Sequence, residues 1–257
     1  MPYFYLYDSY LQDRASANQL IRLESTLTDL GIQGKIGRLT LLKSVRDLVE
    51  AAVRDGADTV VAVGNDTTLS RVAEVLAKHK TVTLGFVPLG QDKQNIAKLL
   101  GIPVGLLACH VLSSRIVEQI SLGKVNNQFF IQSIVGQGTP LIECENQNRI
   151  YKLNLTTPHD IKVCNLDQAD NIEQGFVNPQ SDSLETILQP IVKKHWWQMN
   201  KSQASLPSFI PTKTLKISSG SDEMLLTVDG YKVIKTPVTI TVASEHLKII
   251  VGKKRLF

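Results

Sequence analysis

The sequence predicts an α/β protein in which an N-terminal domain with a parallel sheet precedes a domain built of antiparallel strands. In the first half of the chain, short apolar runs alternate with segments whose apolar residues recur at helical spacing. After about Leu122 this spacing gives way to short strand-like runs that polar stretches separate. The first pattern is typical of a βαβ series and the second of an antiparallel sheet or sandwich. We therefore expect two domains, residues 1–122 and residues 123–257.

The composition is that of an ordinary globular protein. Hydrophobic residues make up 43% of the 257 residues and charged residues 20%, which excludes an intrinsically disordered chain. The net charge of +4 suits an anionic ligand or an anionic membrane surface. It is too small to predict nucleic-acid binding by itself.

The cysteines and the amino terminus bear on the compartment. Cys109, Cys144 and Cys164 form no CxxC pair, and three cysteines cannot all pair within one chain. The first residues show no secretory signal, and no apolar run approaches the roughly 20 residues that span a bilayer. We expect a reducing, cytoplasmic protein that meets a membrane at most by its surface.

The elements of the first half follow in order. Tyr3–Tyr7 predicts a strand, and leucines at helical spacing over Leu20–Leu30 predict a helix. A second short strand leads to Leu39–Leu42. Ser44, with Asp47 three residues on, predicts a capped helix start.

Two further strand–helix pairs complete the N-terminal domain. Thr59–Val63 is a β-branched run, as in a strand that is buried on both faces, and helical spacing follows Gly64–Thr68. Val82–Val87 is another buried strand, which Pro88-Leu89-Gly90 closes. Ile96–Leu100 suggests a short helix.

The second half predicts strands, one helix and one hairpin. Val228-Asp229-Gly230-Tyr231 is a hairpin signal, because Asp and Gly tolerate positive φ at the turn. A helix is expected near Leu184–Trp197. The expected strands are Asn127–Ile134, Arg149–Leu155, Ile161–Cys164, Leu215–Ser218, Met224–Val228, Val238–Val242 and Leu247–Val251.

The segment VVAVGNDTTLSRVAEVL, Val60–Leu76, has the layout of a phosphate-binding site. A strand that runs into a polar, Gly-containing turn and then a helix presents backbone amides and the positive helix end to an anion. The alternative is purely structural, with Asp66 or Thr68 capping the helix.

A second motif, FVPLGQDKQNIAKLLGIP, begins at Phe86, and the two together resemble the diacylglycerol kinase catalytic-domain family. Family members carry GGDGT and then a Pro-Leu-Gly-Thr-Gly-Asn-Asp-Phe-Ala-Arg stretch with Leu-Gly-Ile-Pro. The matching residues are Gly64, Asp66, Thr68, Pro88, Leu89, Gly90, Ala97, Leu100, Gly101, Ile102 and Pro103. Ile120–Phe130 and the end of the chain are also similar to the family, so the resemblance runs from about residue 59 to 251.

The chain departs from the family at several positions. Asn65 and Thr67 replace glycines of the first motif, and Thr67 would be strained if that position required positive φ. Arg71 stands where an acidic residue is usual in the family. Its side chain would either hold a phosphate or lie on a solvated helix face. The second motif reads Gln91–Asn95 and is one residue longer. The family's Asn-Pro-x-Ser-Gly after the first strand is absent from Tyr7–Tyr10.

The resemblance implies a kinase that uses ATP and Mg²⁺ to phosphorylate a hydroxyl of diacylglycerol or a related lipid. The first domain would bind the nucleotide and the second the substrate. The residues that it implies for nucleotide binding are Thr40, Gly64, Asn65, Asp66, Thr67, Thr68, Arg71, Pro88, Leu89, Gly90 and Gln91. No metal ligands are implied by the motifs, and the five histidines have no metal-ligand spacing.

Asp182 is the candidate catalytic base, because Asn178–Glu185 matches the stretch in which the family carries its base. The alternative is that Asp182 caps a helix, with Glu185 completing a capping box ahead of Ile187.

Two other functions are compatible with the sequence. One is a non-catalytic relative that binds a nucleotide or a lipid, which the replaced glycines and Arg71 favour. The other is an NAD kinase, which shares a GGDGT-like loop. Lys193 and Lys194 beside Trp196 and Trp197 suit an anionic bilayer surface, although both tryptophans could instead be core residues.

Overall fold

The computed structural model describes residues 2–90, 94–146, 149–167, 179–181, 183–191, 206–220 and 223–257. The chain forms two compact units. The first comprises Met1–Leu122, Leu166–Gln180 and Ser244–Phe257, and the second comprises Gly123–Asn165 and Ser181–Ala243. The first unit thus includes two segments that a division at residue 122 assigns to the second domain.

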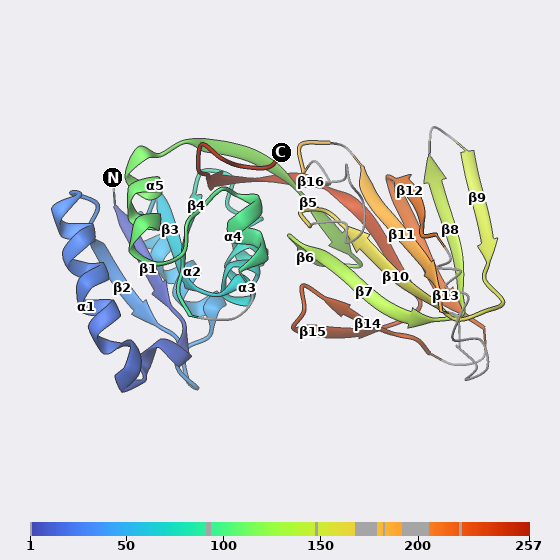
Figure 1. Ribbon diagram of the computed structural model, residues 1–257, viewed down its shortest axis with the longest axis horizontal. Helices are drawn as coiled ribbons and strands as arrows, with labels where there is room; N and C mark the ends of the chain where they lie inside the picture. Colours follow the sequence, from blue (N-terminus) through green and yellow to red (C-terminus); the bar gives the residue numbers. More distant parts are fainter. Residues whose placement is uncertain are drawn as a thin grey trace, which may run out of the picture. The chain divides into compact units, whose positions relative to one another are not determined.

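The first unit alternates strands and helices, as the periodicity predicts (Figure 1). Its elements are β1 (Tyr3–Tyr7), η1 (Ser9–Gln12), α1 (Arg14–Asp29), β2 (Gly34–Arg38), α2 (Val45–Arg54), β3 (Thr59–Gly64), α3 (Asp66–Leu76), β4 (Thr83–Pro88), α4 (Asn95–Leu99), η2 (Gly105–Leu107) and α5 (Ala108–Ser114).

The sheet of the first unit is parallel, in the order β2-β1-β3-β4. Every residue of β1, β3 and β4 is buried, which explains their continuous apolar runs. Helix α2 packs on α3, and α1 on α5. This helical cover on the sheet is what a parallel sheet requires, and it confirms the predicted α/β class (Figure 1).

One strand of this sheet comes from the far end of the chain. β16 (Val238–Ile250) pairs in parallel with β4, through Lys248 with Thr83 and Ile249 with Leu84. Val238–Val242 and Leu247–Val251 therefore belong to one long strand rather than two. Its earlier residues pair with β13 in the second unit.

The second unit consists of antiparallel strands. Its remaining elements are β5 (Val117–Val125), which begins in the first unit, β6 (Gln128–Phe130), β7 (Ser133–Gly138), β8 (Pro140–Asn146), β9 (Arg149–Asn154), β10 (His159–Cys164), β11 (Leu184–Pro190), β12 (Ser208–Thr212), β13 (Thr214–Ser219), β14 (Leu225–Val228) and β15 (Lys232–Lys235). One sheet has the order β12-β11-β10-β7-β14-β15, and the other runs β16-β13-β8-β9.

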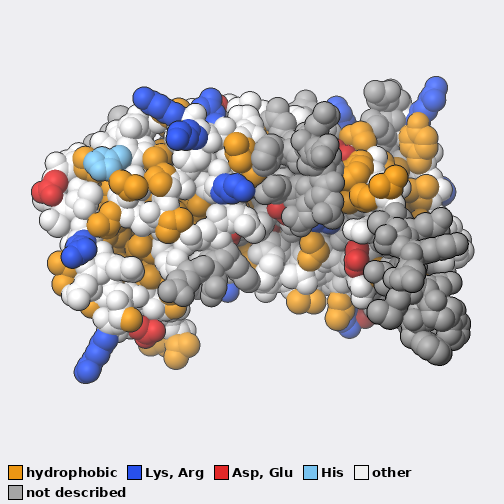
Figure 2. Space-filling model, viewed as in Figure 1, with side chains coloured by type: hydrophobic (Ala, Val, Ile, Leu, Met, Phe, Trp, Pro, Cys, Tyr) orange, Lys and Arg blue, Asp and Glu red, His pale blue; other side chains and the backbone are white. Residues whose placement is uncertain are grey.

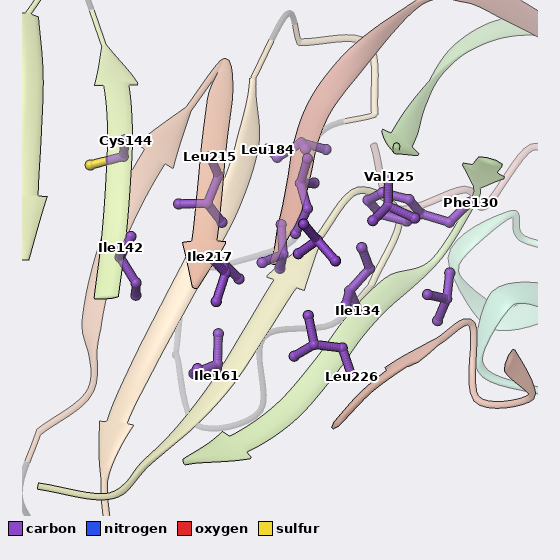
Figure 3. Packing of buried hydrophobic residues seen from close by; sticks show 14 of the residues in the cluster. Val125, Phe130, Ile134, Ile142, Cys144, Ile161, Leu184, Leu215, Ile217 and Leu226 are labelled. Carbon is purple, nitrogen blue, oxygen red and sulfur yellow. The ribbon is translucent and has the colours of Figure 1, made fainter. Parts of the chain in front are cut away.

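The two sheets share one apolar core, so the second unit is a β-sandwich. Ile142, Leu215 and Ile217 from one sheet belong to the same buried cluster as Ile134 and Leu226 from the other (Figure 3). Alternate residues of each strand enter this core, which is the period-2 pattern of a sheet with one solvated face. The predicted sandwich is confirmed.

The helix predicted near Leu184–Trp197 is wrong over its first part. Leu184–Pro190 is strand β11, which pairs with β10 and β12. Leu184, Thr186 and Leu188 are buried in alternation, so the local pattern is that of a strand. Residues 192–197, which include Lys193, Lys194, Trp196 and Trp197, lie outside the described residues.

The hairpin signal at Val228-Asp229-Gly230-Tyr231 is confirmed. β14 and β15 pair with Val228 opposite Lys232, and Asp229 and Gly230 have φ of 47° and 69°. The buried Asp229 carboxylate also accepts hydrogen bonds from three backbone amides, those of Ile131, Gln132 and Ser133. Asp229 thus supplies a positive φ in the turn, and its carboxylate binds the connection between β6 and β7.

Two further observations concern the cysteines and the helices. All three cysteines are buried and none forms a disulfide, and burial raises the pKa of the Cys109 thiol to about 11. Within the described ranges, none of the helices has the length and apolar character that crossing a membrane requires.

Candidate functional site

The site predicted from the motifs lies at the carboxyl edge of the parallel sheet. Asp8 follows β1, Thr40 follows β2, and Gly64 and Pro88 end β3 and β4. The Asp8 amide donates to the Val63 carbonyl at 3.0 Å, and the Leu89 amide donates to the Gly64 carbonyl at 2.9 Å. The two motifs, about 25 residues apart in the chain, therefore meet at this edge, where α/β proteins bind ligands.

Asn65 forms the cap of helix α3. Its side-chain Oδ1 accepts from the Thr68 amide at 3.1 Å, and Thr68 Oγ1 accepts from the Asn65 amide at 3.3 Å. This reciprocal capping box assigns the cap to Asn65, where the sequence suggested Asp66 or Thr68. The amides of Asp66 and Thr67, in the first turn, have no acceptor within the helix, so they could donate to an anion at this helix end.

Neither of the replaced glycines requires a glycine conformation here. Asn65 is extended, with φ −105° and ψ −177°, and Thr67 lies within the first turn of α3. Thr67 is therefore not strained, because β-branched residues adopt helical φ readily. Gly64 is different, since a Cβ there would come within 2.4 Å of Thr68 Oγ1. A side chain at position 64 would therefore clash with Thr68.

Thr68 links the loop to the first strand. Its hydroxyl donates a short hydrogen bond to the carboxylate of Asp8, and both residues are buried. Asp8 also accepts from the Ser9 hydroxyl at 3.2 Å. The hydroxyl of Thr68 therefore has a fixed orientation, which leaves its oxygen available to accept from the Asn65 amide.

The Asp66 carboxylate turns toward the second motif. Its Oδ2 accepts from the Ile96 amide at 3.2 Å, and the amides of Asn95 and Ala97 also stabilise the ionised carboxylate. Asp66 thereby caps α4 from a distance, since Gln94, at the cap position of that helix, makes no side-chain cap bond. The carboxylate holds the two motifs together at the sheet edge.

Burial dominates the electrostatics of Asp66. Only 4% of the residue is exposed, and desolvation raises the pKa of its carboxyl to about 7. This value includes a smaller upward contribution from the nearby Asp167 and the opposing effect of the α4 amides. Asp66 Oδ1 is buried, with no hydrogen-bond partner among the described residues. Near pH 7 a substantial fraction of this carboxyl group is protonated.

The Pro88-Leu89-Gly90 segment is held by Tyr10 from the loop after β1. The Tyr10 hydroxyl donates to the Leu89 carbonyl at 2.6 Å. Gly90 has φ 106°, and a Cβ there would meet the Tyr10 hydroxyl oxygen at 3.2 Å. Gly90 is thus required both by its backbone conformation and by the close tyrosine. Gln91 lies outside the described residues.

Thr40 forms a tight turn directly after β2. Its Oγ1 accepts from the amides of Leu42 and Lys43, and Thr40 and Lys43 form an isolated bridge. The side chain is thus engaged in its own turn, at the same sheet edge as the α3 amino terminus. Arg71 is exposed on α3, more than one helical turn past Asp66.

Asp182, the predicted base, lies outside the described residues. The structure nevertheless removes the alternative role for it. Glu185 and Ile187 belong to strand β11, so no helix begins there for Asp182 to cap. The capping interpretation is wrong, and the catalytic one stays a prediction.

Sequence reasoning missed Asp8 and Tyr10 as members of this site. Both follow the first strand, but they replace the family's glycine-containing segment and carry no motif of their own. Their position after a buried parallel strand was the available signal, because loops at the carboxyl edge meet in space. Their partners, Thr68 and Leu89, could be assigned only from the tertiary structure.

The described residues do not form a Mg²⁺ site. Nowhere in the described ranges do three or more His, Cys, Asp or Glu side chains gather as metal ligands would. Asp66 Oδ1 is sealed from solvent, whereas Mg²⁺ keeps several of its waters when it binds.

Comparisons with known proteins agree with the motifs. The family model described as Diacylglycerol kinase catalytic domain matches residues 9–125. A probable lipid kinase YegS-like protein of Pseudomonas aeruginosa is 37% identical over 92 residues, which are 35% of this chain and 30% of that protein. A diacylglycerol kinase of Staphylococcus aureus is 28% identical over 144 residues, 54% of this chain and 44% of that protein. The matches thus span less than half the length of these curated relatives.

Solved structures share the fold over nearly the whole chain. A diacylglycerol kinase of Bacillus anthracis has a TM-score of 0.75 at 15% identity, covering 99% of this chain and 98% of that one. An NAD kinase of Archaeoglobus fulgidus, solved in complex with ATP, has a TM-score of 0.62 at 13% identity, covering 99% and 95%. At such low identities these structures show the fold alone. The family match over residues 9–125 confirms the resemblance to the diacylglycerol kinase catalytic-domain family that the motifs indicated.

Proposed function

We propose that the protein is an ATP-dependent lipid kinase that transfers the γ-phosphate of ATP to a hydroxyl of diacylglycerol or a related lipid. The supporting observation is that Asp66 of the first motif accepts from α4 amides within the second motif. This bond gathers two phosphate-binding segments at one sheet edge. The relatives named as lipid kinases supply the acceptor class.

The proposed phosphate contacts come from backbone groups. The amides of Asp66 and Thr67 and the positive end of α3 would face the phosphates. Because the Asp66 carboxylate is directed to α4 and buried, it does not oppose a phosphate at this helix end with an exposed negative charge. Thr40 and Gly90 would bound the same region from β2 and β4. Arg71 is exposed one turn further along and would reach outer phosphate oxygens.

The chemical step is an in-line displacement. The acceptor hydroxyl oxygen forms a bond to the γ-phosphorus while the bond from that phosphorus to the β–γ bridging oxygen breaks, which gives ADP and a phosphorylated lipid. Asp182 would accept the proton of the hydroxyl. Mg²⁺ held by the phosphates of the nucleotide would screen their charge.

The test is incubation of the purified chain with γ-labelled ATP and Mg²⁺ in three parallel reactions, with diacylglycerol, with a panel of other hydroxyl lipids and with NAD. Label in a lipid product supports the proposal. Label in NAD would instead indicate an NAD kinase. ATP binding by calorimetry without transfer to any acceptor would indicate a non-catalytic relative.

A further inference from the structure

The turn after β2 places two leucines in water. Leu41 is fully exposed and Leu42 is 94% exposed, although both belong to a well-formed turn. In Figure 2, hydrophobic side chains reach the lower rim of the N-terminal unit, where Figure 1 draws the loop after β2. Single exposed apolar residues are common, but two adjacent ones at the tip of a turn call for a physical reason.

Local structure does not account for these leucines. The turn closes through backbone bonds between Thr40 and Lys43, 3.4 Å and 3.3 Å long, so Leu41 and Leu42 occupy its two central positions. Neither residue has a positive φ, and such turns accept most residue types, so the turn geometry does not select leucine. The bridge and the Thr40 side chain make the tip well ordered, so both apolar side chains are held outward at little further entropic cost.

Cations flank the tip. Lys43 and Arg46 are exposed on its carboxyl side, and Arg38 precedes it at the end of β2. Arg38 lies 3.8 Å from the Glu24 carboxylate, so the positive charge at the tip rests on Lys43 and Arg46. Asp47, the acidic residue of the segment 38–47, accepts from the Ser44 amide and hydroxyl.

Helix electrostatics do not explain these cations. Lys43 and Arg46 lie at the amino end of α2, where the helix dipole disfavours positive charge. An apolar tip with cations around it is instead the arrangement that binds anionic lipid surfaces, because the apolar groups enter the interface and the cations meet the headgroups.

We propose that the tip Leu41-Leu42, with Lys43 and Arg46, docks the first unit onto an anionic lipid bilayer. The tip lies at the carboxyl edge of β2, which is also the edge that carries Asp8, Asn65 and Gly90. Docking there brings the proposed phosphate site to the membrane surface. The inference rests on the proposed lipid acceptor, but its test does not need ATP.

The test is sedimentation of the full chain with vesicles of equal parts phosphatidylserine and phosphatidylcholine, and with vesicles of phosphatidylcholine alone. The parent should bind the mixed vesicles more tightly. Leu41→Ser with Leu42→Ser should weaken this binding at least about tenfold, because two interfacial leucines are lost. The matched control is Val104→Ser with Leu107→Ser, which changes two exposed apolar residues, 53% and 62% exposed, and should bind as the parent does.

Charge is tested separately. Lys43→Glu with Arg46→Glu should weaken binding to the mixed vesicles by about tenfold or more, since each cation near such a surface contributes about fivefold. Lys78→Glu with Lys80→Glu is the control, because these exposed residues lie between α3 and β4 at the opposite edge of the sheet. Melting temperatures of all variants should match the parent's.

A parent that binds neither vesicle, or a double leucine variant that binds like the parent, would overturn the docking surface. A parent that binds mixed vesicles through the leucines but phosphorylates no lipid supports the surface and contradicts the proposed kinase. If the parent phosphorylates detergent-dispersed lipid but the leucine variant still binds vesicles normally, the proposed kinase is supported and the docking surface is contradicted.

Discussion

The hydroxyl of Thr68 donates a hydrogen bond to the carboxylate of Asp8, and this bond joins the first turn of α3 to the end of β1. Thr68 at the same time completes the capping box with Asn65. One side chain thus fixes the start of the helix and the first strand's loop together. The phosphate-binding geometry proposed for this edge depends on that bond.

Thr68→Val should lower stability and weaken ATP binding. Valine keeps the shape but removes the hydroxyl, which leaves the buried Asp8 carboxylate without one of its donors at a cost of about 1–3 kcal/mol. For a chain of this size that corresponds to a drop of roughly 2–4 °C in Tm per kcal/mol. Thr67→Val is the matched control, because Thr67 is half-buried beside it and takes no part in the capping box. Equal Tm values for the two variants would contradict the role of the bond.

Asp66→Asn should change how stability depends on pH. The pKa of Asp66 is raised from 3.8 to about 7, so between these values the folded state binds more protons than the unfolded state. Stability from this group therefore falls as pH rises through that window, by up to about 4 kcal/mol. The asparagine variant lacks this slope. The difference in Tm between parent and variant should favour the parent most near pH 4 and decline until about pH 7, and parallel curves would refute the assignment.

Gly90→Ala should destabilise the loop after β4. Alanine at φ 106° is strained by about 1–3 kcal/mol, and its Cβ would press on the Tyr10 ring at 3.3 Å. We expect a lower Tm and weaker ATP binding by calorimetry. Gly220→Ala is the control, because nothing lies within 4 Å of the new Cβ. A Gly90→Ala variant that binds ATP as tightly as the parent would separate this loop from the site.

Asn65→Gly combined with Thr67→Gly should not strengthen ATP binding. A gain would be expected only if the loop needed glycine conformations at these two positions. In the structure Asn65 caps α3 and Thr67 is helical, so the double change weakens the helix start by roughly 0.5–1 kcal/mol. Calorimetric titration of ATP–Mg²⁺ decides this, and tighter binding by the double variant would show that side-chain bulk, rather than backbone conformation, limits the site.

Asp182→Asn should lower the rate of phosphate transfer at least about 100-fold, the low end for loss of a general base. ATP affinity and Tm should change little. Asp160→Asn is a suitable control, because it neutralises an exposed carboxylate of the same unit. Unchanged turnover in an active preparation would remove Asp182 from the mechanism.

The sequence by itself determined the α/β unit, the sandwich and the edge at which the motifs lie. A continuous apolar run such as Thr59–Gly64 reflects a buried strand, and the helical spacing of α3 reflects one buried helix face. Both patterns are local, so they predict the element from the sequence alone. The Asp229-Gly230 turn was predictable for the same reason, because positive φ is a local demand.

Only the tertiary structure decided the rest. β11 was mistaken for a helix, because its burial depends on strands β10 and β12 rather than on its own spacing. The C-terminal residues Lys248 and Ile249 add a strand to the parallel group β2-β1-β3-β4, which lies in the first 90 residues. The bonds from Asp66 to Ile96 and from Thr68 to Asp8 join residues 30 and 60 positions apart. Such contacts depend on the packing of several elements at once, and no local pattern encodes them.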